Sequence, residues 1–148
     1  MYTVKTVVSF EAAHRLYDVD TFSSECRDNL HGHSYKVTII VGCNNTNSAG
    51  MVIDFKLLKS LIKSAIEDKY DHSCILRKSD PIAEVIMNNC KKVIIVDNSP
   101  TAEWMAKTFY DDVSSIISNH SDVLDVISVS VQETENNIAT YYSKETCI

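Results

Sequence analysis

The stretch HGHSYKVTIIVG, residues 31–42, decides the predicted fold because its residues alternate in character along a full strand length. Its odd-numbered positions hold two histidines and then only Tyr, Val or Ile, whereas Ser34 and Lys36 lie between them. Residues i and i+2 of a β-strand point to the same side of the sheet. The pattern therefore predicts a strand with one apolar face, which begins with the side-by-side imidazoles of His31 and His33.

Three further segments show strand chemistry. Residues 2–14 are rich in Val, Thr, Tyr and Phe, and the even-numbered positions from Tyr2 to His14 share one face. Residues 123–133 alternate in the same way, and residues 137–142 follow an Asn-Asn turn as a short closing strand. Together with residues 31–42 they predict a four-stranded antiparallel sheet.

Two amphipathic helices separate the second and third predicted strands. Asp54 is a capping residue before a helix of about 55–69, and Ser99-Pro100 opens another with a cap and a proline at its first position. We expect a loop at residues 15–30 and a connection that includes the apolar run Val93–Val96. This order is typical of an α+β fold with both helices on one face of the sheet. The exposed sheet edges favour an oligomer.

Composition predicts a single domain over residues 1–148. A formal net charge of -6 argues against nucleic acid or an anionic membrane as a partner. The five cysteines are odd in number and scattered, which is not a disulfide framework. We find neither a signal-peptide pattern nor an apolar run of about 18 residues. These features predict a cytoplasmic protein with reduced thiols.

The histidines at the strand ends form a candidate metal site. If residues 2–14 pair with residues 31–42, His14 lies beside His31 and His33. Three neutral imidazoles with a free fourth position are typical of catalytic zinc, whereas structural zinc normally has four protein ligands. The alternative for each histidine alone is an ordinary packing or surface residue.

Several other residues are candidates for chemistry, each with a plainer alternative. Cys26 precedes the two histidines and is a candidate base or nucleophile, a fourth ligand of a closed zinc site, or an uninvolved loop thiol. Asp71-His72 follows the first helix, where a histidine is also favoured by the helix dipole. Glu133 continues an apolar strand face, where an acid needs a partner such as a ligand with two adjacent N–H donors. The alternatives are a salt bridge or a strand end that has already emerged into solvent.

Six motifs, in order, make the chain resemble the 6-pyruvoyltetrahydropterin synthase and 6-carboxytetrahydropterin synthase family. They are SFEAAHRL (9–16), C-x4-HGHSYKV (26–37), GMVIDF (50–55), YDHSCIL (70–76), SPTAEWMA (99–106) and QETENN (132–137). The resemblance implies the tunnelling fold, in which three subunits close a twelve-stranded barrel, two trimers form a hexamer, and active sites lie between subunits.

The resemblance also implies roles for individual residues. His14, His31 and His33 would hold Zn2+, and Cys26 would be the base, tuned by Asp71 and His72. The remaining positions belong to the pterin pocket: Glu133 would anchor the ring, with Glu103 near it and Thr101 assisting.

The implied substrate is 7,8-dihydroneopterin triphosphate. The chain most resembles the branch that releases triphosphate and acetaldehyde and makes 6-carboxy-5,6,7,8-tetrahydropterin for queuosine biosynthesis. The alternatives are 6-pyruvoyltetrahydropterin synthase of tetrahydrobiopterin biosynthesis, a folate branch with a glutamate in place of the cysteine, and a pterin-binding module without activity. Four residues separate Cys26 from His31, a spacing between those of the first two branches. Glu25 and Asp28 are acids that could assist Cys26.

Overall fold

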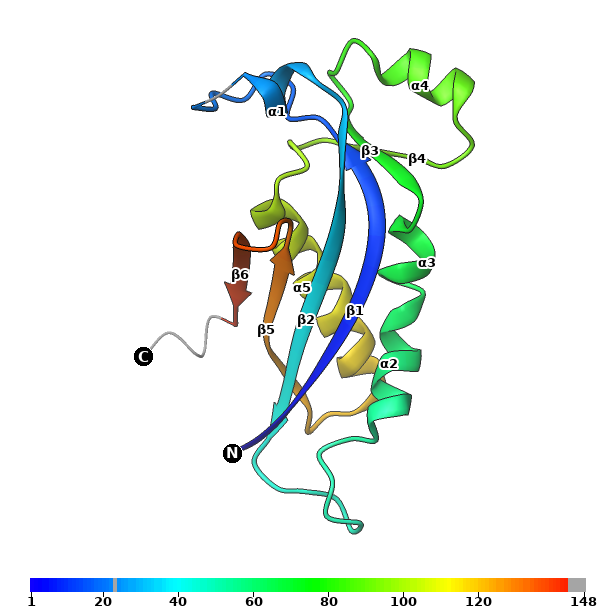
Figure 1. The fold of residues 1–148 in the computed structure, drawn as a ribbon. Helices are drawn as coiled ribbons and strands as arrows, with labels where there is room; N and C mark the ends of the chain where they lie inside the picture. The colour runs from blue at the N-terminus through cyan, green and yellow to red at the C-terminus, as the bar shows by residue number, and fades with distance from the viewer. Residues whose placement is uncertain (23, 144–148) are drawn as a thin grey trace.

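The computed structural model describes residues 1–22 and 24–143, which form one six-stranded sheet with helices packed on one face (Figure 1). The strands are β1 (Tyr2–His14), β2 (His31–Cys43), β3 (Ser73–Arg77), β4 (Val93–Val96), β5 (Asp125–Gln132) and β6 (Ile138–Tyr142). The helices are α1 (Glu25–Asp28), α2 (Phe55–Lys63), α3 (Glu67–Tyr70), α4 (Ala83–Asn89) and α5 (Ala102–His120). The expected α+β class is confirmed.

The long pair β1–β2 is the centre of the sheet. It runs antiparallel in unbroken register from Tyr2 opposite Cys43 to His14 opposite His31. Alternate side chains of both strands are buried under the helices, as the sequence pattern predicts. β5 and β6 continue the antiparallel pairing on the β2 side. All four predicted strands therefore exist, as β1, β2, β5 and β6.

The prediction of a sheet with only four antiparallel strands is wrong, because two short strands extend it beyond β1. The strand order is β4-β3-β1-β2-β5-β6, and β3 pairs in parallel with the end of β1 and with β4. β4 is the run Val93–Val96, which we expected in a connection. Strands of four and five residues are too short to show a clear alternation.

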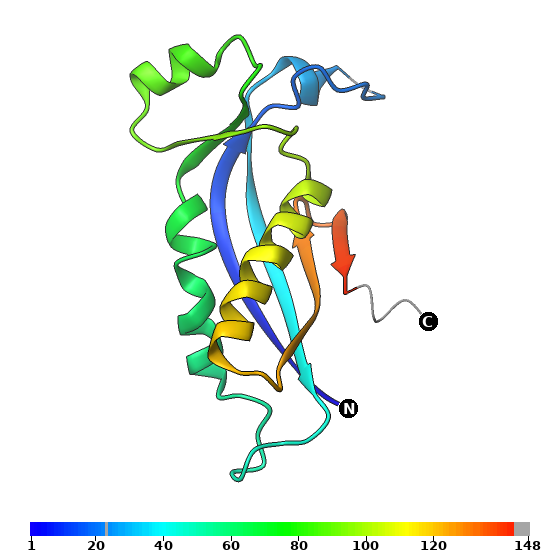
Figure 2. The same ribbon diagram turned by 180° about the vertical axis from the view of Figure 1, so that it is seen from behind.

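The helices cover one face of the sheet, as expected, although their boundaries differ from the prediction. Figure 2 shows α2, α3 and α5 lying across that face. The helix expected at 55–69 ends at Lys63 and resumes as the one-turn α3. α5 begins at Ala102 rather than Pro100, because the hydroxyl of Thr101 accepts a hydrogen bond from Trp104 N at 3.1 Å and caps the helix.

Aromatic side chains join the two layers. Phe10 of β1 stacks on Tyr35 of β2 and meets the edge of Phe109 of α5, which also packs on Tyr70. All four are buried. Within the described ranges, no helix is long and apolar enough to cross a membrane.

Candidate metal centre and adjoining pocket

Three histidines converge at the end of the sheet where β1 finishes and β2 begins. His14 lies opposite His31 and Ala12 lies opposite His33, so the three side chains share the face that the helices cover. One nitrogen from each ring lies within 4.8 Å of the other two. The predicted meeting of the three imidazoles is therefore confirmed.

Backbone carbonyl groups fix the protonation pattern of two of these rings. His14 Nδ1 lies 2.8 Å from the carbonyl oxygen of Pro100, and His31 Nδ1 lies 2.9 Å from that of Asn29. A carbonyl oxygen only accepts, so each Nδ1 carries the hydrogen and each neutral ring presents an unprotonated Nε2. Burial lowers the pKa of His14 from 6.5 to about 4, which keeps this ring neutral at pH 7.

The resulting cluster has nitrogen lone pairs with no hydrogen between them. His14 Nε2 and His31 Nε2 lie 3.1 Å apart, and His33 Nε2 is buried without a hydrogen-bond partner. Facing lone pairs repel, and a cation between them removes the conflict. Tetrahedral zinc with Zn–N bonds of about 2.05 Å would separate its nitrogen ligands by about 3.3 Å. The donor set and its backbone-held orientation therefore fit zinc.

Glu133 lies at the border of the histidine cluster, one residue beyond the end of β5. Its Oε1 is 3.4 Å from His14 Nε2 and 3.9 Å from His33 Nε2. Burial raises the pKa of Glu133, and the charge of Glu103 adds to this effect. An acid in this position needs a cation or hydrogen-bond donors to satisfy it, as the sequence pattern predicts.

A pocket of about 430 Å³ adjoins the cluster and brings the other predicted ligand residues together. Thr101, Glu103 and Glu133 all line it, and Leu16 forms another part of its wall. The Thr101 side chain is engaged in capping α5, so its contribution is to the position of this wall. Glu103, two residues later, is in the first turn of the same helix.

Cys26 lies in the short helix α1, in the segment that precedes β2. Its carbonyl oxygen accepts a hydrogen bond from Leu16 N at 3.0 Å, which holds α1 beside the chain that leaves β1. The thiol is half-buried. Among the residues that the structure describes, Cys26 is not part of the metal-ligand group. This arrangement does not favour a closed structural site with Cys26 as the fourth ligand.

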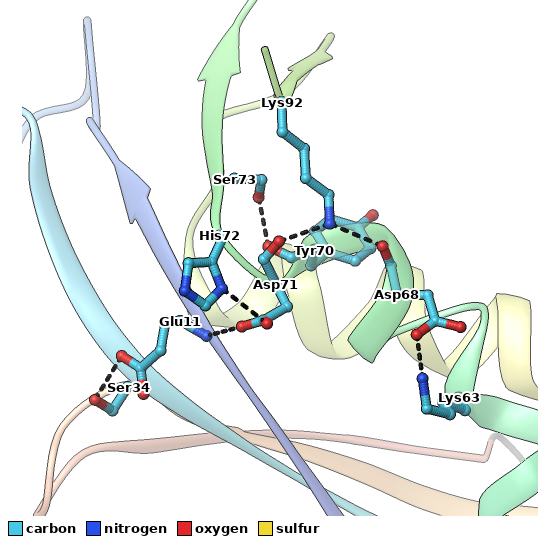
Figure 3. Close-up of polar contacts among 9 residues, drawn as sticks. All are labelled: Glu11, Ser34, Lys63, Asp68, Tyr70, Asp71, His72, Ser73 and Lys92. Carbon is cyan, nitrogen blue, oxygen red and sulfur yellow. Dashed lines mark hydrogen bonds and ion pairs between the residues drawn. The ribbon is translucent and has the colours of Figure 1, made fainter. Parts of the chain in front are cut away.

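Asp71 and His72 lie on a different part of the sheet, where β3 joins β1 (Figure 3). Asp71 accepts a hydrogen bond from Glu11 N at 2.9 Å, and His72 N donates to Glu11 O at 2.7 Å. The His72 ring is 81% exposed and lies 2.8 Å from Asp71. It borders a shallow pocket with Glu11 and Ser34, whose side chains point to the uncovered face.

Apart from Cys26, which lies in α1, the structure divides the predicted site residues into two groups. His14, His31, His33 and Glu133 meet on the covered face, with Glu103 and Thr101 in the adjoining pocket. Asp71 and His72 pair with each other on the open side of the same chain. His72 adopts the left-handed backbone conformation, with φ of 58°, and its ring contacts the adjacent Asp71 directly.

Two sets of contacts near the centre were not predicted from the sequence. The Tyr35 ring lies edge-on to His33 and His14, and its buried hydroxyl has no hydrogen-bond partner. Its position two residues after His33 in a strand was the available signal. Arg15, directly after His14, forms a buried ion pair with Asp80, with N–O distances of 2.6 and 2.9 Å. No local pattern links these two residues.

Comparison with known proteins gives one consistent result. Residues 3–144 match the protein family described as 6-pyruvoyl tetrahydropterin synthase. A 6-carboxy-5,6,7,8-tetrahydropterin synthase from Rickettsia conorii is 36% identical, covering 72% of this chain and 75% of the relative. The enzyme of that name from Haemophilus influenzae is 30% identical, and the match covers 95% of this chain and 99% of the relative. The structure of Caenorhabditis elegans 6-pyruvoyl tetrahydropterin synthase superposes with a TM-score of 0.68 at 27% identity. The superposition covers 97% of this chain and 96% of the other.

Proposed function

Because this chain belongs to the 6-pyruvoyl tetrahydropterin synthase family, we propose that it is a zinc-dependent lyase acting on 7,8-dihydroneopterin triphosphate. The product is 6-carboxy-5,6,7,8-tetrahydropterin, formed with release of triphosphate and acetaldehyde. The relatives from Rickettsia conorii and Haemophilus influenzae carry the name of this reaction. We place the protein in the cytoplasm, in the queuosine branch.

One observation carries the proposal: three imidazole nitrogens converge beside a carboxylate and an open pocket, and those of His14 and His31 present facing lone pairs. A packing role would leave this repulsion uncompensated. A metal removes it and leaves room for a substrate oxygen. When bound, zinc would polarise oxygens of the substrate side chain and acidify the neighbouring C–H groups.

The residues of the chain supply recognition and proton transfer. The Glu133 carboxylate accepts hydrogen bonds from two adjacent N–H groups of the pterin ring, which also satisfies this half-buried group. Glu103 faces the same pocket. The Cys26 thiolate removes a proton from the substrate side chain and returns protons as the ring is reduced.

We assign Asp71 and His72 to the active site of a neighbouring subunit, within a hexamer of two trimers. Their exposure on the uncovered face leaves them free to reach another chain. Glu11 holds Asp71 through its backbone N–H, and this bond together with His72 lowers the pKa of Asp71. The resulting carboxylate–imidazole pair would stabilise the Cys26 thiolate of the neighbour.

Product analysis tests the reaction. The zinc-loaded protein is incubated with 7,8-dihydroneopterin triphosphate, and the products are identified by mass spectrometry. We expect triphosphate, acetaldehyde and 6-carboxy-5,6,7,8-tetrahydropterin. Turnover without acetaldehyde would instead assign the protein to the 6-pyruvoyl branch. No triphosphate release from a metal-loaded protein would contradict the enzyme proposal and favour a pterin-binding module.

Subunit complementation tests the shared site. Cys26→Ala and His72→Ala are each expected to bind zinc and lose activity. When the two variants are mixed by co-refolding in equal amounts, about a quarter of the sites regain both residues if the site lies between subunits. A mixture that stays inactive, although the two variants assemble together, would exclude the shared site.

A further inference from the structure

Two cysteines outside the candidate active site lie near each other at the β3–β4 side of the sheet. Cys74 lies in β3, and Cys90 is the residue that ends α4. Cys74 N donates to Lys92 O at 3.0 Å, and Cys74 is opposite Val93 in the parallel β3–β4 register. Cys90 lies two residues before Lys92. This register places Cys90 beside Cys74, and the Cys90 thiol is near enough to raise the pKa of the Cys74 thiol.

The two thiols differ in their access to solvent. Cys90 is exposed, whereas Cys74 is half-buried. Burial and the neighbouring Cys90 thiol both raise the pKa of Cys74. The remaining described cysteines lack such a partner: Cys43 is buried and its thiol donates to the carbonyl oxygen of Asn45, and Cys26 lies in α1. An exposed thiol beside a half-buried one is suited to a reaction in which the first attacks and the second resolves.

We propose that Cys74 and Cys90 are a reversible two-electron redox pair, which closes to an intramolecular disulfide on reaction with a low-molecular-weight disulfide. This site uses none of the residues assigned to the proposed pterin reaction. In the structure both cysteines are free thiols, which corresponds to the reduced form.

The reaction balances as two thiol–disulfide exchanges. The Cys90 thiolate attacks one sulfur of oxidised glutathione, forms a mixed disulfide and releases one glutathione thiolate. The Cys74 thiolate then attacks the Cys90 sulfur, forms the Cys74–Cys90 bond and releases the second glutathione. The protein loses two protons and two electrons, and these electrons reduce one glutathione disulfide to two thiols.

The disulfide would tie the segment after α4 to the start of β3. That segment includes Lys92, whose Nζ donates to the carbonyl oxygens of Asp68 at 2.8 Å and Asp71 at 2.6 Å (Figure 3). These carbonyls close the turn that leads into His72. Oxidation would therefore restrain the backbone that carries the exposed Asp71–His72 pair.

The test uses the full chain in glutathione redox buffers, followed by acid quenching, alkylation and non-reducing peptide mapping. We expect a Cys74–Cys90 linked peptide that disappears with reductant. Cys74→Ser should accumulate glutathione on Cys90, because no thiol resolves the adduct, whereas the unchanged chain should show little of it. Cys26→Ser is the matched control and should retain the cross-link.

Two results would overturn the proposal. One is a glutathione adduct that persists on Cys90 in the unchanged chain at the level seen in Cys74→Ser, with Cys74 still alkylated. The other is oxidation that links Cys90 or Cys74 only to other cysteines, or only between chains.

Discussion

The ion pair between Arg15 and Asp80 gives a sharp test of how the short strands are attached to the rest of the sheet. The Asp80 side chain is fully buried, and that of Arg15 is 12% exposed. Asp80 accepts two hydrogen bonds from the guanidinium group and one from Ile82 N at 3.0 Å, just before α4. The perturbation is Asp80→Asn, which removes the charge with almost no change of volume.

The expected loss of unfolding free energy is about 3 kcal/mol. Removing one partner of a buried ion pair costs about 3–5 kcal/mol, because the other charge stays buried without compensation. The asparagine oxygen still accepts one hydrogen bond, which puts the expectation at the lower end of that range. Asp68→Asn is the matched control, because Asp68 pairs with Lys63 where both side chains are 55% exposed. We expect it to cost less than about 1 kcal/mol.

Urea unfolding at pH 7, followed by the fluorescence of Trp104, the single tryptophan, measures both variants. Protein concentration is kept equal, since assembly contributes to apparent stability. Adding Arg15→Gln to Asp80→Asn should cost little more, because the interaction is already lost. The reasoning is refuted if the Asp80 and Asp68 variants differ by less than about 0.5 kcal/mol, the usual range for surface substitutions.

Three further predictions concern the histidine cluster. His33→Ala should weaken zinc binding by about 100-fold or more, since it removes one of three ligands; competition with a chromogenic chelator measures this, and unchanged affinity would exclude His33 as a ligand. The metal-free protein should lose about 3 kcal/mol of stability as the pH falls from 6.5 to about 4, because the unfolded chain protonates His14 at its ordinary pKa of 6.5 and the folded chain only near 4. His14→Gln should flatten that part of the stability curve in urea titrations, and an unchanged slope would contradict the assignment. Tyr35→Phe removes a buried hydroxyl without a partner, so thermal unfolding should show equal or slightly higher stability; a loss above about 1 kcal/mol would mean that the hydroxyl is satisfied.

The sequence predicted strand faces and strand pairing correctly where a regular pattern extends over many residues. β1 and β2 each have 13 residues and alternate over most of that length, so both the faces and the pairing of His14 with His31 could be inferred. Glu133 was recognisable because an acid follows the buried Val129 and Val131 on one face. Such patterns work because the side-chain period of a strand is two.

Contacts between distant segments could not be inferred in this way. β3 and β4 have too few residues for a periodic signal. They pair in parallel although α4 lies between them in the sequence. The position of Asp71 depends on a hydrogen bond to Glu11, which is 60 residues away along the chain. Arg15 and Asp80 likewise meet only after folding. Composition and local spacing therefore cannot predict such pairs.

β1 has a consequence for how substitutions in it should be interpreted. The backbone of Glu11 forms hydrogen bonds with Asp71 and His72. Three residues further along the same strand, His14 belongs to the histidine cluster. At about 3.4 Å per residue, the two points are about 10 Å apart on one rigid strand. Ala12 and Ala13 lie between them. We therefore expect a substitution at either alanine to affect both points, so that mutational data at these positions report the sum of two effects.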